Sequence, residues 1–284
     1  EASSEDVGVR ALDERTLEVT LEKPTAYFLS LASFHAFYPV HRASIEKAPE
    51  SWSSQAETLI GNGPFRLTGW VHHGSLSFAK NPYYRDAVSI RLDGMYWPIV
   101  DAQATRLTLV ETGQADMMVE PPVVEHDRLQ KEGLLRIAPY LGLYYYVFNT
   151  QAPPFDRVEV RRAFALSFQR QALITQVVKG GKLPAYAWVP PGLTNPATGL
   201  DFRQEGGDLI REDAAAAKEA LQKAGYGEAL PPVTLLFNTG EMHKAIAEAA
   251  QEMWKQSLGV TVTLTNQESK VFLASRTRGE FQIA

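Results

Sequence analysis

Short segments in which apolar and polar residues alternate occur in pairs along the first part of the chain. Residues 7–12 and 16–21 form one pair and residues 65–70 and 76–80 another, each joined by a short polar connection. Alternation with a period of two predicts a strand with one apolar face, and two such strands with a short connection predict an antiparallel hairpin. Besides these two hairpins, the pattern predicts helices at 24–33, 42–47 and 101–112 and strands at 89–97 and 115–119.

After residue 143, strands and helices alternate more regularly. Apolar residues recur at helical spacing from 156 to 179, where Gly180-Gly181 follows as a stop. Asp156 with Glu159 three residues later has the arrangement of a capping box, so we expect this helix to begin at Asp156. Such alternation predicts an α/β unit whose sheet is covered by helices. The remaining predicted elements are helices at 212–224, 241–258 and 270–277, strands at 144–148, 233–238 and 260–265, and a strand that begins at 281–284.

Composition limits the class of function without selecting one. The 284 residues include 33 acidic and 28 basic side chains, the net charge is −5, and Lys and Arg form no stripe. A nucleic-acid-binding surface is therefore not expected. An apolar share of 45% supports real hydrophobic cores, and no apolar run approaches the ~18–20 residues of a membrane span.

Sequence signatures of catalysis or of a metal site are missing. No nucleophile elbow, zinc-protease or nucleotide-binding motif occurs, and the lack of Cys excludes a thiol nucleophile. His72 and His73 are adjacent, so on a strand they would point to opposite faces, and exposed turn residues are the preferred interpretation. Glu212 and Asp213 fall in the predicted first turn of a helix, where the macrodipole favours acidic residues. We expect a protein that is not an enzyme and that needs no metal or cofactor.

Several short motifs follow one another along nearly the whole chain. They are GNGPF at 61–65, KNPYY at 80–84, YYYVFNT, PPF and VEVRRA between 144 and 163, PPG at 190–192, AGY at 224–226 and WKQSLGV at 254–260. In this order they resemble the oligopeptide-binding proteins of bacterial ABC importers, extracellular solute-binding protein family 5. Each motif alone is weak, and their shared order makes the resemblance specific.

The resemblance implies a two-lobed type II periplasmic-binding-protein fold of the α/β class, incomplete here. Residues 1–143 would form part of lobe I and residues 144–284 most of lobe II. The implied function is to capture short peptides outside the cytoplasmic membrane and to deliver them to the membrane subunits of an ABC permease. The protein would be a monomer, periplasmic or extracellular, and a membrane-anchored lipoprotein in a Gram-positive organism. Family members continue beyond the strand that begins at 281, so we expect the chain to be a fragment.

The resemblance also selects candidate ligand-binding residues. Tyr140 and Tyr145 match tyrosines that line the ligand cleft in the family, and phenol rings offer apolar contact area plus one hydroxyl. His243 matches a histidine near the carboxyl end of the ligand. Arg276 matches an arginine beside that end, where a guanidinium can form charge-assisted hydrogen bonds to a carboxylate. Ordinary strand aromatics and solvated helix residues are the alternative interpretation of these four positions.

Periodicity adds one geometric expectation about the tyrosines. On a strand, Tyr144 and Tyr146 share one face and Tyr145 takes the other.

The resemblance leaves alternative functions open. They are binding of another solute known in the family, namely nickel, haem or sugar, and a peptide-processing or chaperone-like role in the cell envelope.

Overall fold

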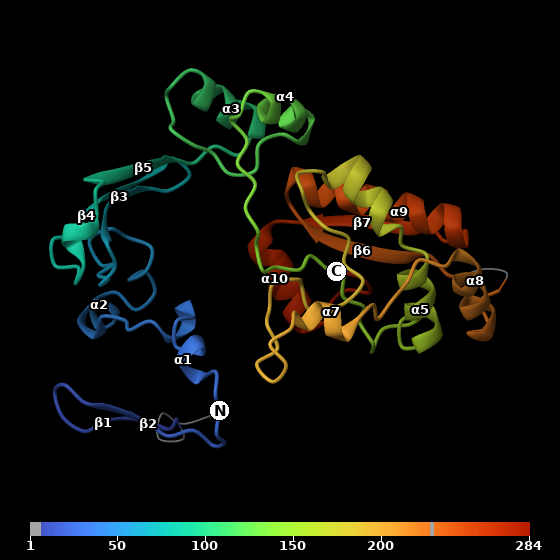
Figure 1. Cartoon of the computed structure of the whole chain (residues 1–284), viewed down its shortest axis with the longest axis horizontal. Helices are drawn as coiled ribbons and strands as arrows, with labels where there is room; N and C mark the ends of the chain where they lie inside the picture. Colours follow the sequence, from blue (N-terminus) through green and yellow to red (C-terminus); the bar gives the residue numbers. More distant parts are fainter. Residues whose placement is uncertain (1–6, 228–229) are drawn as a thin grey trace. The chain divides into compact units, whose positions relative to one another are not determined.

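The computed structural model of the chain describes residues 7–227 and 230–284, and its elements fall into two units, Glu1–Ala102 and Gln103–Ala284 (Figure 1). Residues 103–143 therefore group with the C-terminal part of the chain. The predicted lobe boundary between residues 143 and 144 concerns the full-length fold and stays a prediction.

Both predicted hairpins are present in the first unit. Strands β1 (Val9–Ala11) and β2 (Leu17–Val19) pair antiparallel. Strands β3 (Phe65–Val71), β4 (Ser75–Lys80) and β5 (Gly94–Pro98) form an antiparallel sheet in the order β3-β4-β5. The strand predicted from residue 89 begins later, because a 3₁₀ turn occupies Ala87–Ser89. The short helical elements of this unit are α1 (Phe28–Leu31), η2 (His35–Phe37) and α2 (Arg42–Lys47).

The second unit begins with short helices. Helix α3 (Gln103–Glu111) is followed by η4 (Val123–Glu125) and α4 (His126–Lys131). The strand predicted at 115–119 is absent, and that prediction was wrong. Met117 and Val119 are exposed, and no strand among the described residues pairs with the backbone there, so alternation alone does not produce a strand.

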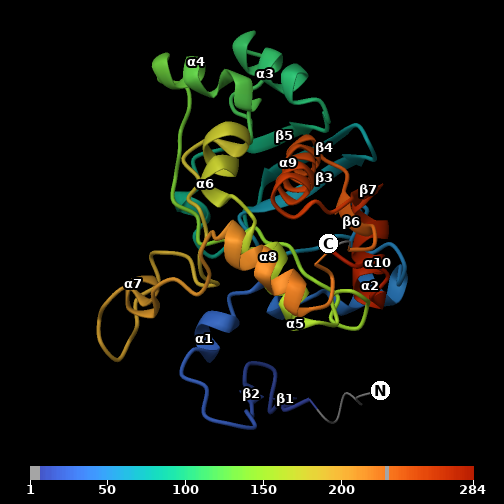
Figure 2. The same ribbon diagram turned by 90° about the vertical axis from the view of Figure 1, so that its right-hand side faces the viewer.

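Two parallel strands and the helix that joins them form the centre of the second unit. Strand β6 (Val233–Asn238) pairs in parallel with β7 (Val262–Gln267), and α9 (Glu241–Leu258) connects them and packs on both. Helix α10 (Ser269–Arg278) contacts β6, and Figure 2 shows this arrangement from the side. The predicted bounds of β6 and α9 are confirmed, because each pattern is long and ends at a turn or a glycine.

The end of the chain extends this sheet. Ile283 forms a parallel bridge to Leu235 and an antiparallel bridge to Phe148, which confirms the extended conformation expected at 281–284. The backbones of Val147 and Ala284 exchange two hydrogen bonds of 2.8 and 3.0 Å. The strand predicted at 144–148 is therefore paired only near its end, and its first residues are irregular.

The long helix predicted at 156–179 is interrupted, and that prediction was wrong. Helix α5 (Val158–Leu166) ends at a buried serine, Ser167, whose hydroxyl donates to the Ala163 carbonyl at 2.8 Å. The chain continues as α6 (Arg170–Ala172) and a π-helical turn, η5 (Leu173–Val178). The break lets Phe168 turn towards Trp254, and their ring centroids lie 5.8 Å apart. Packing of side chains therefore outweighs continuity of the helix.

The predicted capping box at Asp156 was also wrong. Arg157 is the N-cap of α5 and makes no side-chain cap hydrogen bond. The predicted stop lies in the right place: the helical segment ends at Val178, and Lys179, Gly180 and Gly181 follow with φ angles of 49°, 65° and 74°.

Glu212 lies outside the helix in which it was predicted and caps α6 instead. Helix α8 (Ala214–Lys223) begins after Asp213, whose side chain accepts from the Ala216 N–H, so Glu212 lies before the first turn. The Glu212 carboxylate instead accepts the Arg170 backbone N–H at 2.8 Å and the Tyr186 hydroxyl at 2.9 Å. It thereby satisfies a free amide at the start of α6 and fixes the loop that contains Tyr186 and α7 (Phe202–Gly206).

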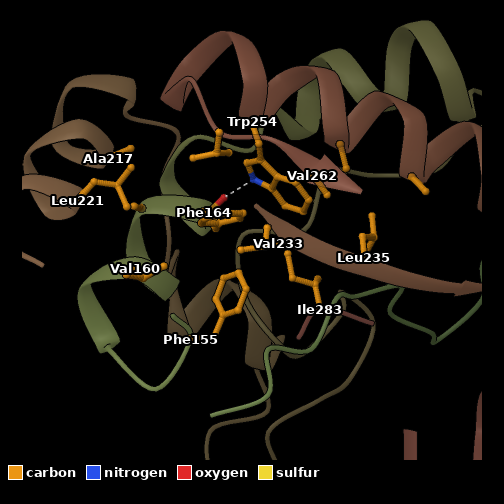
Figure 3. Packing of buried hydrophobic residues seen from close by; sticks show 14 of the residues in the cluster. Phe155, Val160, Phe164, Ala217, Leu221, Val233, Leu235, Trp254, Val262 and Ile283 are labelled. Carbon is orange, nitrogen blue, oxygen red and sulfur yellow. Dashed lines mark hydrogen bonds between the residues drawn. The ribbon is translucent and has the colours of Figure 1, made fainter. Parts of the chain in front are cut away.

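The largest hydrophobic core lies between α5, α8, α9 and the sheet, as Figure 3 shows. Trp254 of α9 is 1% exposed and stands 5.0 Å from the Phe164 ring. Its indole N–H donates to the Phe164 carbonyl at 2.9 Å. Phe164 lies in the last turn of α5, and carbonyls in the last turn of a helix have no N–H partner within the helix. Trp254 therefore fills the core and also satisfies one of these carbonyls.

Candidate ligand-binding site

A pocket of about 190 Å³ lies at the carboxyl end of β6, beside the first turn of α9. In open parallel sheets, ligands bind beyond the carboxyl ends of the strands. All the residues that line it belong to the second unit: Leu143, Tyr144, Tyr145, Tyr146, Val147, Leu236, Phe237, Asn238, His243, Phe272, Arg276 and Ala284.

The tyrosine segment crosses the pocket with its side chains on alternating sides, as the sequence predicts. The rings of Tyr144 and Tyr146 meet edge to face at 6.3 Å. Tyr145 instead contacts Trp188 of the loop after η5, at a centroid distance of 4.8 Å. Hydrogen bonds between Val147 and Ala284 fix the end of this segment against the C-terminal strand, which positions the tyrosines over β6.

Tyr144 and His243 form a direct pair in the pocket. The Tyr144 hydroxyl lies 2.9 Å from His243 Nδ1, and the two rings stack with centroids 5.7 Å apart and planes inclined by 25°. Although Tyr144 is 52% exposed overall, burial of its hydroxyl end raises its pKa to about 12. The phenol therefore keeps its proton across the physiological range.

Arg276 supplies positive charge to the same pocket. Its guanidinium is solvent-exposed and forms no hydrogen bond or ion pair with the residues that the structure describes. Its neighbour on α10, Arg278, is fully engaged by Glu280 through contacts of 2.7 and 2.8 Å. Arg276 is thus free to bind an anionic group that enters the pocket.

Three of the four candidate residues come together here. Tyr145, His243 and Arg276 line the pocket, whereas Tyr140 does not and is 89% exposed. Whether any of them binds ligand stays a prediction. Sequence reasoning missed Tyr144 as a site residue, because the alternation put it opposite Tyr145 without showing which face meets α9. The run of three tyrosines was the one feature of the sequence that could have indicated Tyr144 as a site residue.

Two chemical features do not occur in the described parts of the chain. Residues 7–227 and 230–284 contain no group of three or more His, Cys, Asp or Glu side chains placed to hold a metal ion. Within the same residues, no helix combines the length and the apolar composition needed to cross a bilayer.

Comparison with known proteins places the chain in a family. The model of the bacterial extracellular solute-binding proteins, family 5 Middle, matches residues 1–284. The chain belongs to this family. The resemblance inferred from the short motifs is therefore confirmed.

Relatives of the chain are named for different ligands. The chain is 39% identical over 283 residues to the dipeptide-binding protein DppE of Bacillus subtilis, covering 99% of this chain and 52% of DppE. It is 37% identical over 284 residues to the probable deoxycholate-binding periplasmic protein YgiS of Escherichia coli, covering 98% of this chain and 52% of YgiS. The chain spans about half the length of these relatives.

A solved structure of a similar protein has the same fold. The murein tripeptide binding protein MppA of Escherichia coli matches with a TM-score of 0.85 and 32% identity, over 99% of this chain and 55% of MppA. This match confirms the predicted α/β periplasmic-binding-protein fold, of which the chain represents about half. Among such proteins, binding rather than catalysis is the common property.

A buried hydroxyl in the pocket leads to a prediction about stability. The Tyr146 hydroxyl is buried, and burial raises its pKa, yet it has no hydrogen-bond partner among the described residues. An unsatisfied buried hydroxyl is unfavourable, so Tyr146→Phe should raise the free energy of unfolding by about 1 kcal/mol. Urea unfolding followed by circular dichroism measures this. Tyr144→Phe, which removes a hydroxyl that has a partner, is the matched control and should not stabilise the protein.

The raised pKa of Tyr144 predicts a pH dependence. An unfolded tyrosine ionises near pH 10, and the folded residue ionises near 12, so the folded state holds its proton more tightly. This contribution to stability is complete below pH 10 and is lost as the pH rises towards 12. The wild type should therefore lose more unfolding free energy over this window than Tyr144→Phe. Parallel curves for the two proteins would contradict the prediction.

Proposed function

We propose that the full-length protein containing this chain binds short peptides outside the cytoplasmic membrane and delivers them to an ABC permease. The observation that carries the proposal is the free guanidinium of Arg276 in one pocket with His243 and three tyrosines. The names of DppE and MppA, a dipeptide and a murein tripeptide binder, support the same class of ligand.

The pocket offers the groups that one end of a peptide requires. A carboxylate would accept charge-assisted hydrogen bonds from Arg276, while Tyr145 and Tyr144 would contact the adjoining residue through their rings. Backbone hydrogen bonds to an extended peptide would supply affinity that does not depend on the peptide's sequence. Bridging waters cost only ~0–2 kcal/mol each, so hydrated side-chain pockets would accept many peptides.

Native mass spectrometry of the full-length protein, purified under mild conditions, tests this proposal. We expect co-purified short peptides, visible as a ladder of added masses that disappears after denaturation. A uniform adduct with the mass of a metal, haem, sugar or bile acid would overturn the assignment to peptides.

The name of YgiS is the specific observation that favours a second candidate, a carboxylate-bearing steroid. Its acid group would also suit Arg276, so competition distinguishes the two ligands. Deoxycholate should not displace a bound peptide at equimolar concentration if the peptide is the ligand. A peptide-processing role predicts cleavage products after incubation with a peptide mixture, and a chaperone-like role predicts binding of unfolded proteins in preference to short peptides.

The chain of 284 residues should bind peptides weakly or not at all. Its pocket provides contacts from residues 143–284 only, and the chain spans about half the length of the relatives. Isothermal calorimetry with a mixture of tripeptides and tetrapeptides should therefore give no heat above dilution in the micromolar range. Micromolar binding by this chain would show that the rest of the relatives' length is dispensable.

A further inference from the structure

The His243 ring is held on two sides. Tyr144 stacks against it and contacts its Nδ1 atom at 2.9 Å. On another side lies Gly240, the N-cap of α9, where an added Cβ would stand 2.8 Å from His243 Cδ2. The absence of a side chain at Gly240 therefore leaves room for the ring to lie over the start of the helix. Such a ring has little freedom to rotate.

The hydrogen bond between the two residues also selects a tautomer. A neutral imidazole carries one proton, on Nδ1 or on Nε2. If Nδ1–H donated to the phenol oxygen, the phenol hydrogen would have no acceptor among the residues that the structure describes, because His243 is the only partner of Tyr144 there. If the phenol donates to Nδ1, its hydrogen is satisfied and the imidazole proton lies on Nε2. The second arrangement satisfies more groups, so it is favoured.

We propose that Tyr144 is a positioning residue that holds neutral His243 in the Nε2–H tautomer. His243 then presents an N–H donor at Nε2, and Arg276 contributes a positive charge to the same pocket. This combination suits one acceptor-rich anionic group, such as the carboxylate of a peptide. The ligand part of this inference rests on the proposed function, whereas the tautomer does not.

Nuclear magnetic resonance tests the tautomer directly in the 284-residue chain. With ¹⁵N-labelled histidine, a long-range nitrogen–proton correlation recorded at a pH of about 8.5, two units above the ordinary pKa of histidine, reports the two ring nitrogens of neutral imidazoles. The chain has six histidines, and the signals lost in His243→Gln identify His243. We expect an unprotonated Nδ1 and a protonated Nε2 in wild type, and a mixture of tautomers in Tyr144→Phe.

Two variants separate positioning from a merely structural role. Tyr144→Phe keeps the ring and removes only the hydroxyl, and Gly240→Ala pushes the His243 ring from the other side. Both should change the nitrogen shifts of His243 while leaving those of His126 unaltered. A protonated Nδ1 in wild type, or the same tautomer distribution in wild type and Tyr144→Phe, would overturn the proposal.

Binding to the full-length protein completes the test. Tyr144→Phe should weaken a peptide with a free carboxylate by about two- to tenfold, the effect of one hydrogen bond, and amidation of the peptide should remove most of this difference. Failure of wild type to bind any peptide would overturn the proposed function and leave the tautomer result standing. Peptide binding with equal affinity in both proteins would instead overturn the role of Tyr144 alone.

Discussion

Replacing Trp254 by alanine should destabilise the second unit by about 3–5 kcal/mol, the usual cost of deleting a large buried aromatic side chain. Trp254 is 1% exposed, and the rings of Phe164, Phe168 and Tyr146 lie within 6.0 Å of it. Its loss leaves a cavity between α5, α9 and the sheet and removes the donor to the Phe164 carbonyl. Urea unfolding followed by far-ultraviolet circular dichroism measures the change without relying on tryptophan fluorescence.

Two further variants make this result specific. Trp254→Phe retains a ring and removes the N–H, so its cost should lie well below that of Trp254→Ala, because Ser167 also reaches the Phe164 carbonyl. Trp188→Ala, at a residue that is 63% exposed, should change stability by no more than about 0.5 kcal/mol. Equal losses in Trp254→Ala and Trp188→Ala would show that Trp254 does not organise the core.

In the full-length protein, Arg276→Ala should weaken the binding of peptides with a free carboxyl terminus by about ten- to a hundredfold, as expected for hydrogen bonds to a charged group. The amidated forms of the same peptides should lose much less affinity, because they offer no negative charge to the guanidinium. Calorimetric titration of each matched pair of peptides measures both effects. Equal losses for both peptides would remove Arg276 from the site.

The same helix provides the control for this experiment. Arg278 lies two residues after Arg276 and is already paired with Glu280 through two hydrogen bonds. Arg278→Ala removes the same charge from α10 and should leave both peptides unaffected. Arg276→Lys keeps the charge but not the planar fork of donors, so it should recover part of the lost affinity.

Local patterns predicted the regular elements of the chain well. Helix α9 and strand β6 have the predicted bounds, and both N-terminal hairpins form, because each has a clear period and a turn or a glycine at its end. The alternation of Tyr144, Tyr145 and Tyr146 was also correct, because Tyr144 and Tyr146 contact each other and Tyr145 contacts Trp188. Family motifs, confirmed by the match over residues 1–284, supplied the class of fold.

Errors occurred where a partner far along the chain decided the conformation. The helix after Val158 breaks at Ser167 because Phe168 packs on Trp254, and α6 is capped by Glu212, which is 42 residues from Arg170. The strand predicted at 115–119 has no neighbour to pair with in the part of the chain that the structure describes. Neither propensity nor periodicity contains this information.

By itself, the sequence determined most of the helices and strands, the family to which the chain belongs, and which side of the tyrosine segment each ring occupies. Only the tertiary structure decided that Tyr144, and not Tyr140, lies in the pocket with Arg276 and His243. Tyr144 and His243 are 99 positions apart, and their contact depends on how the tyrosine segment pairs with the last residues beside β6. The free energy of that packing, which no local pattern encodes, selects the residues that form the site.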